Sequence, residues 1–180
     1  MRLIESAYQY CSHPDNIEVI IRFDSDDGES IPRIRELARF GPQCRHLVGD
    51  RLKGYASVAT FCQELDAVAS CDWRWHLNDD MVIQRRDDTC KYVPFDKQVE
   101  SHPTTGVLLQ PEWHQLGGSG YQFDAGGSAP IYPKSLIEGI GMQNPPDKFL
   151  MSRAQELEWE TKFLMGVGFW HDWQGQNIPQ

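Results

Sequence analysis

Trp73-Arg-Trp-His-Leu-Asn-Asp-Asp80 shows how this chain is built, because a short apolar run ends there at two adjacent carboxylates. Trp73, Trp75 and Leu77 alternate with polar residues, which is the period of a β-strand. Adjacent carboxylates at the end of a strand repel each other unless a cation lies between them. Oxygen ligands of this kind suit Mg²⁺ or Mn²⁺. The alternative for Asp79-Asp80 is a solvated Asx turn that simply follows the strand.

The chain before this segment alternates between predicted helices and strands. A β-branched strand over 17–23 ends in a second acidic cluster, Asp24-Ser-Asp-Asp-Gly28. The other elements of this half are helices over 2–11, 32–40 and 56–70, and a strand over 44–48. Such alternation predicts an α/β fold with a mostly parallel sheet flanked by helices. Ligands of open α/β sheets bind beyond the carboxyl ends of the strands, where both acidic clusters are expected.

The second half of the chain has a looser pattern. Glycine is dense in Gly117-Gly-Ser-Gly120 and Asp124-Ala-Gly-Gly127, which favours loops around a site or plain connections. A helix over 135–140, a helix over 145–158 and an apolar strand over 161–170 follow. The sequence has no repeat, low-complexity tract or linker. We therefore predict a single domain, 1–180, with halves at 1–83 and 84–180.

The composition is that of an ordinary globular protein. The 180 residues are 40% hydrophobic and 24% charged, with a formal net charge of −9. This charge argues against a nucleic-acid backbone as the main partner, although it does not exclude a local basic cleft. No apolar run is long enough to cross a membrane and no signal peptide is recognisable, so we expect a cytoplasmic protein. The five cysteines include no C-x-x-C pair, which argues against a zinc knuckle.

Three stretches of the first half form a set that points to a family. They are Glu18-Val-Ile-Ile-Arg-Phe-Asp-Ser-Asp-Asp27, Arg51-Leu-Lys-Gly-Tyr55 and Asp72-Trp-Arg-Trp-His-Leu-Asn-Asp-Asp80. Together they resemble the nucleotide-sugar-binding half of GT-A glycosyltransferases, family 2-like. The resemblance implies a GT-A-like (Rossmann-like) fold and a metal-dependent transferase that moves a sugar from a nucleotide-sugar donor to an acceptor hydroxyl. It covers most of the chain, and its specific motifs lie within 17–80.

The resemblance implies nucleotide-binding roles for residues near the first two strand ends. Asp24 is similar to the family's base-contacting Asp, with Asp26 and Asp27 close by. Arg51 and Lys53 stand before the long helix, where the family places a cation near the nucleotide. The alternatives are a turn residue in an acidic loop for Asp24 and a solvated face for the two cations.

The resemblance also implies a metal site. Asp79 and Asp80 are similar to the D-x-D motif that binds ribose and a divalent cation, Mn²⁺ or Mg²⁺, with Asp80 favoured for the metal. The first position of that motif holds Asn78, so the adjacent pair carries it. His171 resembles the late His that touches the metal or the diphosphate in some members, with a capped or core histidine as the alternative. A UDP-sugar is the expected donor.

The acceptor side of the resemblance lies in the second half. Ala129-Pro-Ile-Tyr-Pro-Lys134 is similar to the family's segment before a short helix. Asp147 is similar in place to the general-base carboxylate, which takes the proton of the acceptor hydroxyl. Glu156 and Glu158 are rivals for that role, and a favourable charge at a helix N-terminus is the alternative for Asp147. The likeness implies inversion at the anomeric carbon, and the acceptor itself is not indicated.

The aromatic residues fall into two groups. Trp73 and Trp75 lie in a predicted strand and are expected in the core. Trp113, Tyr121 and Trp170 lie in looser segments and are candidates to stack on a sugar or an acceptor.

The start of the sequence departs from the family. Members begin with a strand and a loop that carries part of the nucleotide pocket, whereas this sequence starts at Met1 within what would be the first helix. The difference predicts a sheet edge that must be covered, for example in a homodimer. Two other functions stay open: a catalytically inactive nucleotide-binding or assembly module of the same fold, and a metal-dependent phosphohydrolase or nucleotidyltransferase. Nucleotidyltransferases of this layout usually carry a Gly-rich loop after the first strand, and this sequence has none there.

Overall fold

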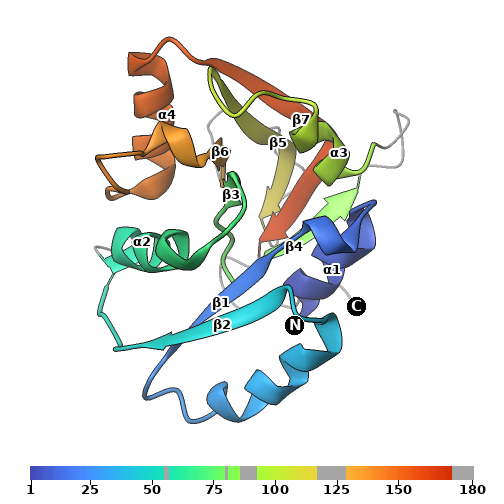
Figure 1. Ribbon diagram of the computed structural model, residues 1–180, viewed down its shortest axis with the longest axis vertical. Helices are drawn as coiled ribbons and strands as arrows, with labels where there is room; N and C mark the ends of the chain where they lie inside the picture. The colour runs from blue at the N-terminus through green and yellow to red at the C-terminus, as the bar shows by residue number, and fades with distance from the viewer. Residues whose placement is uncertain (55–56, 80, 86–92, 117–128, 172–180) are drawn as a thin grey trace.

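The structure is a computed structural model that describes residues 1–54, 57–79, 81–85, 93–116 and 129–171, without the side chains of 113–116 and 171. The helices, with η for 3-10 helices, are α1 (Arg2–Tyr10), η1 (Pro14–Asn16), η2 (Ile31–Phe40), α2 (Val58–Val68), α3 (Phe95–Glu100), η4 (Lys134–Leu136) and α4 (Pro146–Glu156). The strands are β1 (Val19–Asp24), β2 (Cys44–Gly49), β3 (Trp73–Trp75), β4 (Met81–Arg85), β5 (Val107–Leu116), β6 (Ile131–Pro133) and β7 (Glu160–His171). Together they make an α/β fold with two sheets (Figure 1).

The first half follows the predicted order of helix and strand, from α1 to β3. β1 and β2 pair in parallel, with Val19 opposite Cys44, and form a sheet of two strands. Ile4 of α1 and Leu37 of η2 are buried together with Cys44, so these two helices cover one face of the pair. β1 is half-buried along its whole length rather than fully buried as its sequence predicted.

The larger sheet is mixed, so the prediction of a mostly parallel sheet is wrong for it. Its five strands lie in the order β3-β6-β5-β7-β4, and only β5 and β7 are parallel neighbours. The reason is that β4 and β6, which periodicity did not identify as strands, pair antiparallel with their neighbours, and that β5, also not identified, is antiparallel to β6. A bulge between Pro111 and Trp113 interrupts the β5–β7 pairing, because proline has no N–H to donate to the ladder.

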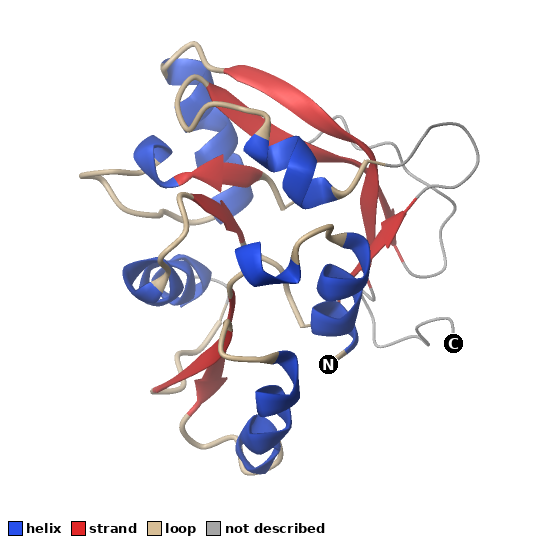
Figure 2. Ribbon diagram, turned by 45° about the vertical axis from the view of Figure 1, so that its right-hand side comes forward, coloured by secondary structure: helices blue, strands red, loops and turns tan. Residues whose placement is uncertain are grey.

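Helices cover both faces of this sheet, with α2 and α4 on one side and α1 and α3 on the other (Figures 1 and 2). Successive residues of a strand point to opposite faces. Leu108 of β5 and Tyr132 of β6 therefore pack with α2 and α4. Leu109 and Ile131, their neighbours in sequence, pack with α1 and α3. The sheet is thus a central layer with an apolar core on each face.

The central position of Leu109 gives a test of this layering. Its side chain is fully buried and pairs across to Ile131, so Leu109→Ala should lower the free energy of unfolding by about 2–5 kcal/mol. Met165→Ala, at a β7 position that is 49% exposed, should cost under about 1 kcal/mol. Urea denaturation of both variants measures the difference. Equal costs for the two substitutions would contradict the described core.

Candidate functional site

The carboxyl ends of β1 and β2 bring the first acidic cluster together with a cation. Asp24 ends β1 directly opposite Gly49, which ends β2, because the two strands are parallel and in register. The Ser25 N–H donates to the Gly49 carbonyl at 2.8 Å, which extends this pairing by one residue. Arg51 follows two residues after β2. The loops that leave the two strands therefore start side by side, as expected for a ligand site in an α/β sheet.

Arg51 lies among the predicted carboxylates. Its Nε donates to both carboxylate oxygens of Asp26, at 2.7 and 3.0 Å, and lies 3.7 Å from Asp24 Oδ2. The hydrogen bond to Asp26, with the charges of Asp26, Asp24 and Asp27, raises the pKa of Arg51 above its ordinary value. The Asp27 carboxylate accepts the backbone N–H groups of Ser30 and Glu29, and the contacts with Ser30 lower its pKa.

Lys53, the other predicted cation, is exposed. Its carbonyl accepts the Ser57 hydroxyl at 3.0 Å just before α2 begins. The backbone of Lys53 thus helps to start that helix, and its nucleotide-binding role stays a prediction.

A second arginine, which the sequence analysis did not single out, is buried beside this cluster. The Arg22 side chain is only 6% exposed and contacts the carboxylates of Asp24 on β1 and Glu64 on α2. The signal in the sequence was an arginine within the apolar run Val19-Ile-Ile-Arg-Phe23. A charge at such a position needs a buried partner.

The predicted metal ligands are described only in part. Asp79 is exposed after β3, Asp80 lies outside the described residues, and the backbone of His171 ends β7 opposite Met81 while its side chain is not described. Within the part of the chain that the structure describes, no three His, Cys, Asp or Glu side chains converge as a metal site. Asp79, among those same residues, makes no ion pair with the cluster around Asp24.

Asp147, the predicted base, lies exposed in the first turn of α4. Figures 1 and 2 both show α2 between α4 and the β1–β2 pair. An open depression of about 440 Å³ beside α4 is lined among others by Asn144, Lys148 and Ser152, and Asp147 is not among its lining residues. Of the rivals, Glu156 pairs with Arg153 on the same helix and also lines the depression, and Glu158 adopts φ +56° in the turn between α4 and β7.

The tryptophans divide differently from the prediction. Trp73 and Trp75 pack against the core as expected, and Trp75 donates its indole N–H to the Ala129 carbonyl at 2.9 Å. Trp170 was a candidate for stacking on a sugar, and this is wrong because its side chain is only 3% exposed within β7. The side chain of Trp113 and all of Tyr121 lie outside the described residues.

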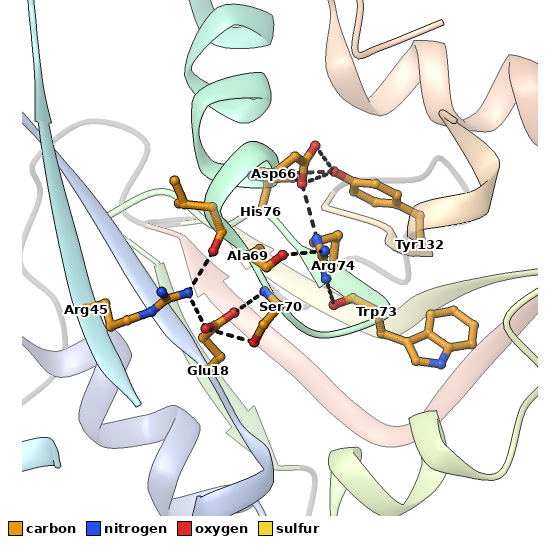
Figure 3. A network of polar contacts seen from close by, with 10 residues as sticks. Glu18, Arg45, Asp66, Ala69, Ser70, Trp73, Arg74, His76 and Tyr132 are labelled. Carbon is orange, nitrogen blue, oxygen red and sulfur yellow. Dashed lines mark hydrogen bonds and ion pairs between the residues drawn. The ribbon is translucent and has the colours of Figure 1, made fainter. Parts of the chain in front are cut away.

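A buried polar network links α2 to β3 and β6 (Figure 3). Tyr132 donates to Asp66 Oδ2 at 2.9 Å and lies 2.6 Å from His76 Nε2, which is 3.2 Å from Asp66 Oδ1. Arg74 Nε lies 3.5 Å from the same Asp66 oxygen. Burial lowers the pKa of His76, but its contacts with Asp66 and Cys62 outweigh this and raise that pKa to about 9. The network therefore holds a charged imidazole at neutral pH.

Figure 3 also shows how the first three strands begin together. Glu18, just before β1, accepts the backbone N–H of Ser70 at 2.7 Å, and Ser70 lies just before β3. Arg45 at the start of β2 pairs with Glu18 and donates to the Val68 carbonyl at 2.7 Å. These contacts hold together the N-terminal ends of β1 and β2, at the opposite end of the small sheet from Asp24 and Arg51.

The sequence matches no protein-family model and no curated protein. None of the described helices is long and apolar enough to cross a membrane. Function is therefore inferred from the residues and geometry of the site.

The raised pKa of His76 predicts a pH dependence of stability. The folded protein holds a proton on His76 up to pH about 9, whereas an unfolded His loses it near its ordinary pKa of 6.5. The contribution is complete below pH 6.5 and is lost as the pH rises to 9, a loss of ~3 kcal/mol at most. The free energy of unfolding, measured by urea denaturation between pH 6 and 9.5, should fall across this window.

His76→Gln should flatten that fall, and His102→Gln, which removes an imidazole outside the network, should keep it. An unchanged fall in the His76→Gln variant would refute the assignment.

Proposed function

We propose that this chain binds a nucleotide-sugar at the carboxyl ends of β1 and β2 and acts as a metal-dependent, inverting glycosyltransferase with a GT-A-like fold. The observation that carries the proposal is the meeting of Asp24, Asp26 and Asp27 with Arg51 at this edge. These are the positions to which the sequence resemblance gave the donor nucleotide. A UDP-sugar is the proposed donor, and the acceptor is a hydroxyl of unassigned identity.

The charges at this edge suit an exchange of partners. Arg51 is 47% exposed, and its bond to Asp26 is a surface ion pair of small net value. A diphosphate offers the guanidinium a stronger bidentate partner, so Arg51 can leave Asp26 for the ligand. The Asp24 side chain is less exposed than that of Arg51 and would stay in place, with its carboxylate near the nucleobase.

The proposed metal ligands are Asp79, Asp80 and His171. The carboxylates of Asp24 and Asp26, at the end of β1, do not suit a metal ion, because they are already paired with the guanidinium groups of Arg22 and Arg51. This leaves the cation to the segment after β3, where Asp79 is exposed. Bound there, Mn²⁺ or Mg²⁺ would supply charge stabilisation to the leaving diphosphate.

On the acceptor side, Asp147 is the proposed base. Its exposed position in the first turn of α4 supports this role, since a carboxylate at the surface is accessible to an acceptor hydroxyl. α4 and the β1–β2 edge lie on different sides of α2, which favours a second candidate, a binding module of the same fold without transfer activity (Figure 1).

Nucleotide binding should depend on the metal and on Asp80. Calorimetric titration with UDP and GDP should give binding of one nucleotide with Mn²⁺ present, and Asp80→Asn should weaken it at least about tenfold, or 1.4 kcal/mol. The control is Asp72→Asn, which alters an exposed carboxylate just before β3 and should leave nucleotide binding as in wild type. Undiminished binding by Asp80→Asn would remove the metal assignment.

Sugar transfer should depend on Asp147 while nucleotide binding does not. Asp147→Asn should keep the wild-type affinity for UDP and lose at least about 100-fold in transfer, the usual scale of general-base catalysis. The control is Asp15→Asn, because Asp15 also follows a proline in the first turn of a helix and is exposed. Transfer is followed as UDP release with a panel of acceptors. Full activity of Asp147→Asn places the base elsewhere, and UDP binding without release in wild type supports the binding module.

A further inference from the structure

Arg22 is buried, and each of the three nitrogens of its guanidinium group donates a hydrogen bond. Nε donates to Glu64 Oε2 at 2.6 Å, Nη1 donates to the Asp24 carboxylate, and Nη2 donates to the Asp50 carbonyl at 2.5 Å. The Phe61 ring lies against the group, with its centroid 4.3 Å from Cζ. Burial lowers the pKa of Arg22, but the bonds to Glu64 and Asp24 outweigh this and raise it. These contacts allow the group a single orientation.

The end of β2 is shaped to admit this group. A Cβ atom at Gly49 would lie 2.9 Å from Arg22 Nη2, which is too close for a carbon atom, and 3.3 Å from Glu64 Oε2, which is a tight contact. Glycine therefore leaves the space in which the guanidinium lies beside the backbone.

The orientation of Arg22 decides what Asp24 offers to a ligand. Asp24 Oδ1 accepts from Arg22, while Oδ2 lies 3.7 Å from Arg51 Nε, beyond hydrogen-bond distance. The Asp24 side chain is 24% exposed. One carboxylate oxygen is thus fixed and the other can accept a hydrogen bond from outside.

We propose that Arg22 and Glu64 are positioning residues that hold Asp24 to accept a ring N–H of a nucleobase, so that the site prefers uracil or guanine to cytosine. This inference rests on the proposed function. An ionised carboxylate only accepts hydrogen bonds. Uracil and guanine carry an N–H on the pairing edge of the ring, whereas cytosine has a lone pair at the corresponding nitrogen. Glu64 contacts Arg22 and not Asp24, so it acts on the base only through Arg22.

UDP and CDP test the inference, because they share ribose and diphosphate and differ only in the base. Calorimetry with Mn²⁺ should give tighter binding of UDP by wild type. Arg22→Lys, which keeps the charge but not the fixed fork, should reduce the UDP-to-CDP affinity ratio at least about tenfold, with CDP binding unchanged. Glu64→Gln should reduce the ratio in the same way. It tests the inference independently if Arg22→Lys does not fold.

The matched control is Arg39→Gln. Arg39 also donates to a glutamate, Glu5, and lies over an aromatic ring, Phe40, but its side chain is 52% exposed and lies on η2. This variant should keep the wild-type ratio.

Several outcomes overturn the inference. Equal weakening of UDP and CDP would make Arg22 and Glu64 merely structural, and a wild-type ratio in folded Arg22→Lys and Glu64→Gln would remove their role. A wild-type protein that binds both nucleotides equally would remove the base contact while leaving the proposed function. A wild-type protein that binds neither would overturn the proposed function as well.

Discussion

Two carboxylates on α2, Glu64 and Asp66, hold the two sheets of this protein to one helix. Residues two apart on a helix point about 200° from each other, so the pair faces in different directions. Glu64 contacts Arg22 of the small sheet, and Asp66 contacts Arg74 and Tyr132 of the large one. A buried charge that loses its partner is costly, so each contact constrains the position of α2. The layout of the strand ends depends on this helix.

The electrostatics of the proposed site follow from this arrangement. Asp24 and Asp26 are neutralised by arginines, one buried and fixed and the other exposed. A fixed guanidinium orients a carboxylate, whereas an exposed one can change partners at small cost. In the proposed site, Arg22 would hold Asp24 for the nucleobase and Arg51 would leave Asp26 for the phosphate. The two arginines differ in exposure because Arg22 lies within β1 against Glu64 of α2, whereas Arg51 lies in the segment that follows β2.

The parts that the sequence predicted are those set by local pattern. The alternation of helix and strand up to β3 is found, and Asp24 and Arg51 meet because parallel strands end at one edge. The mixed sheet was not predicted, since short strands such as β6 carry no period and pair with distant segments. Arg22 was missed for the same reason: its partner Glu64 lies 42 residues away, and no spacing rule joins them.

The most direct test of the account locates a bound nucleotide on the protein. Backbone amide NMR shifts can be followed as UDP is added in the presence of Mg²⁺. We predict that the largest changes fall on Ser25 to Ser30 and on Gly49 to Lys53, the loops that leave β1 and β2. Changes confined to the depression beside α4, or to the residues around Asp66, would contradict a nucleotide site at the strand ends.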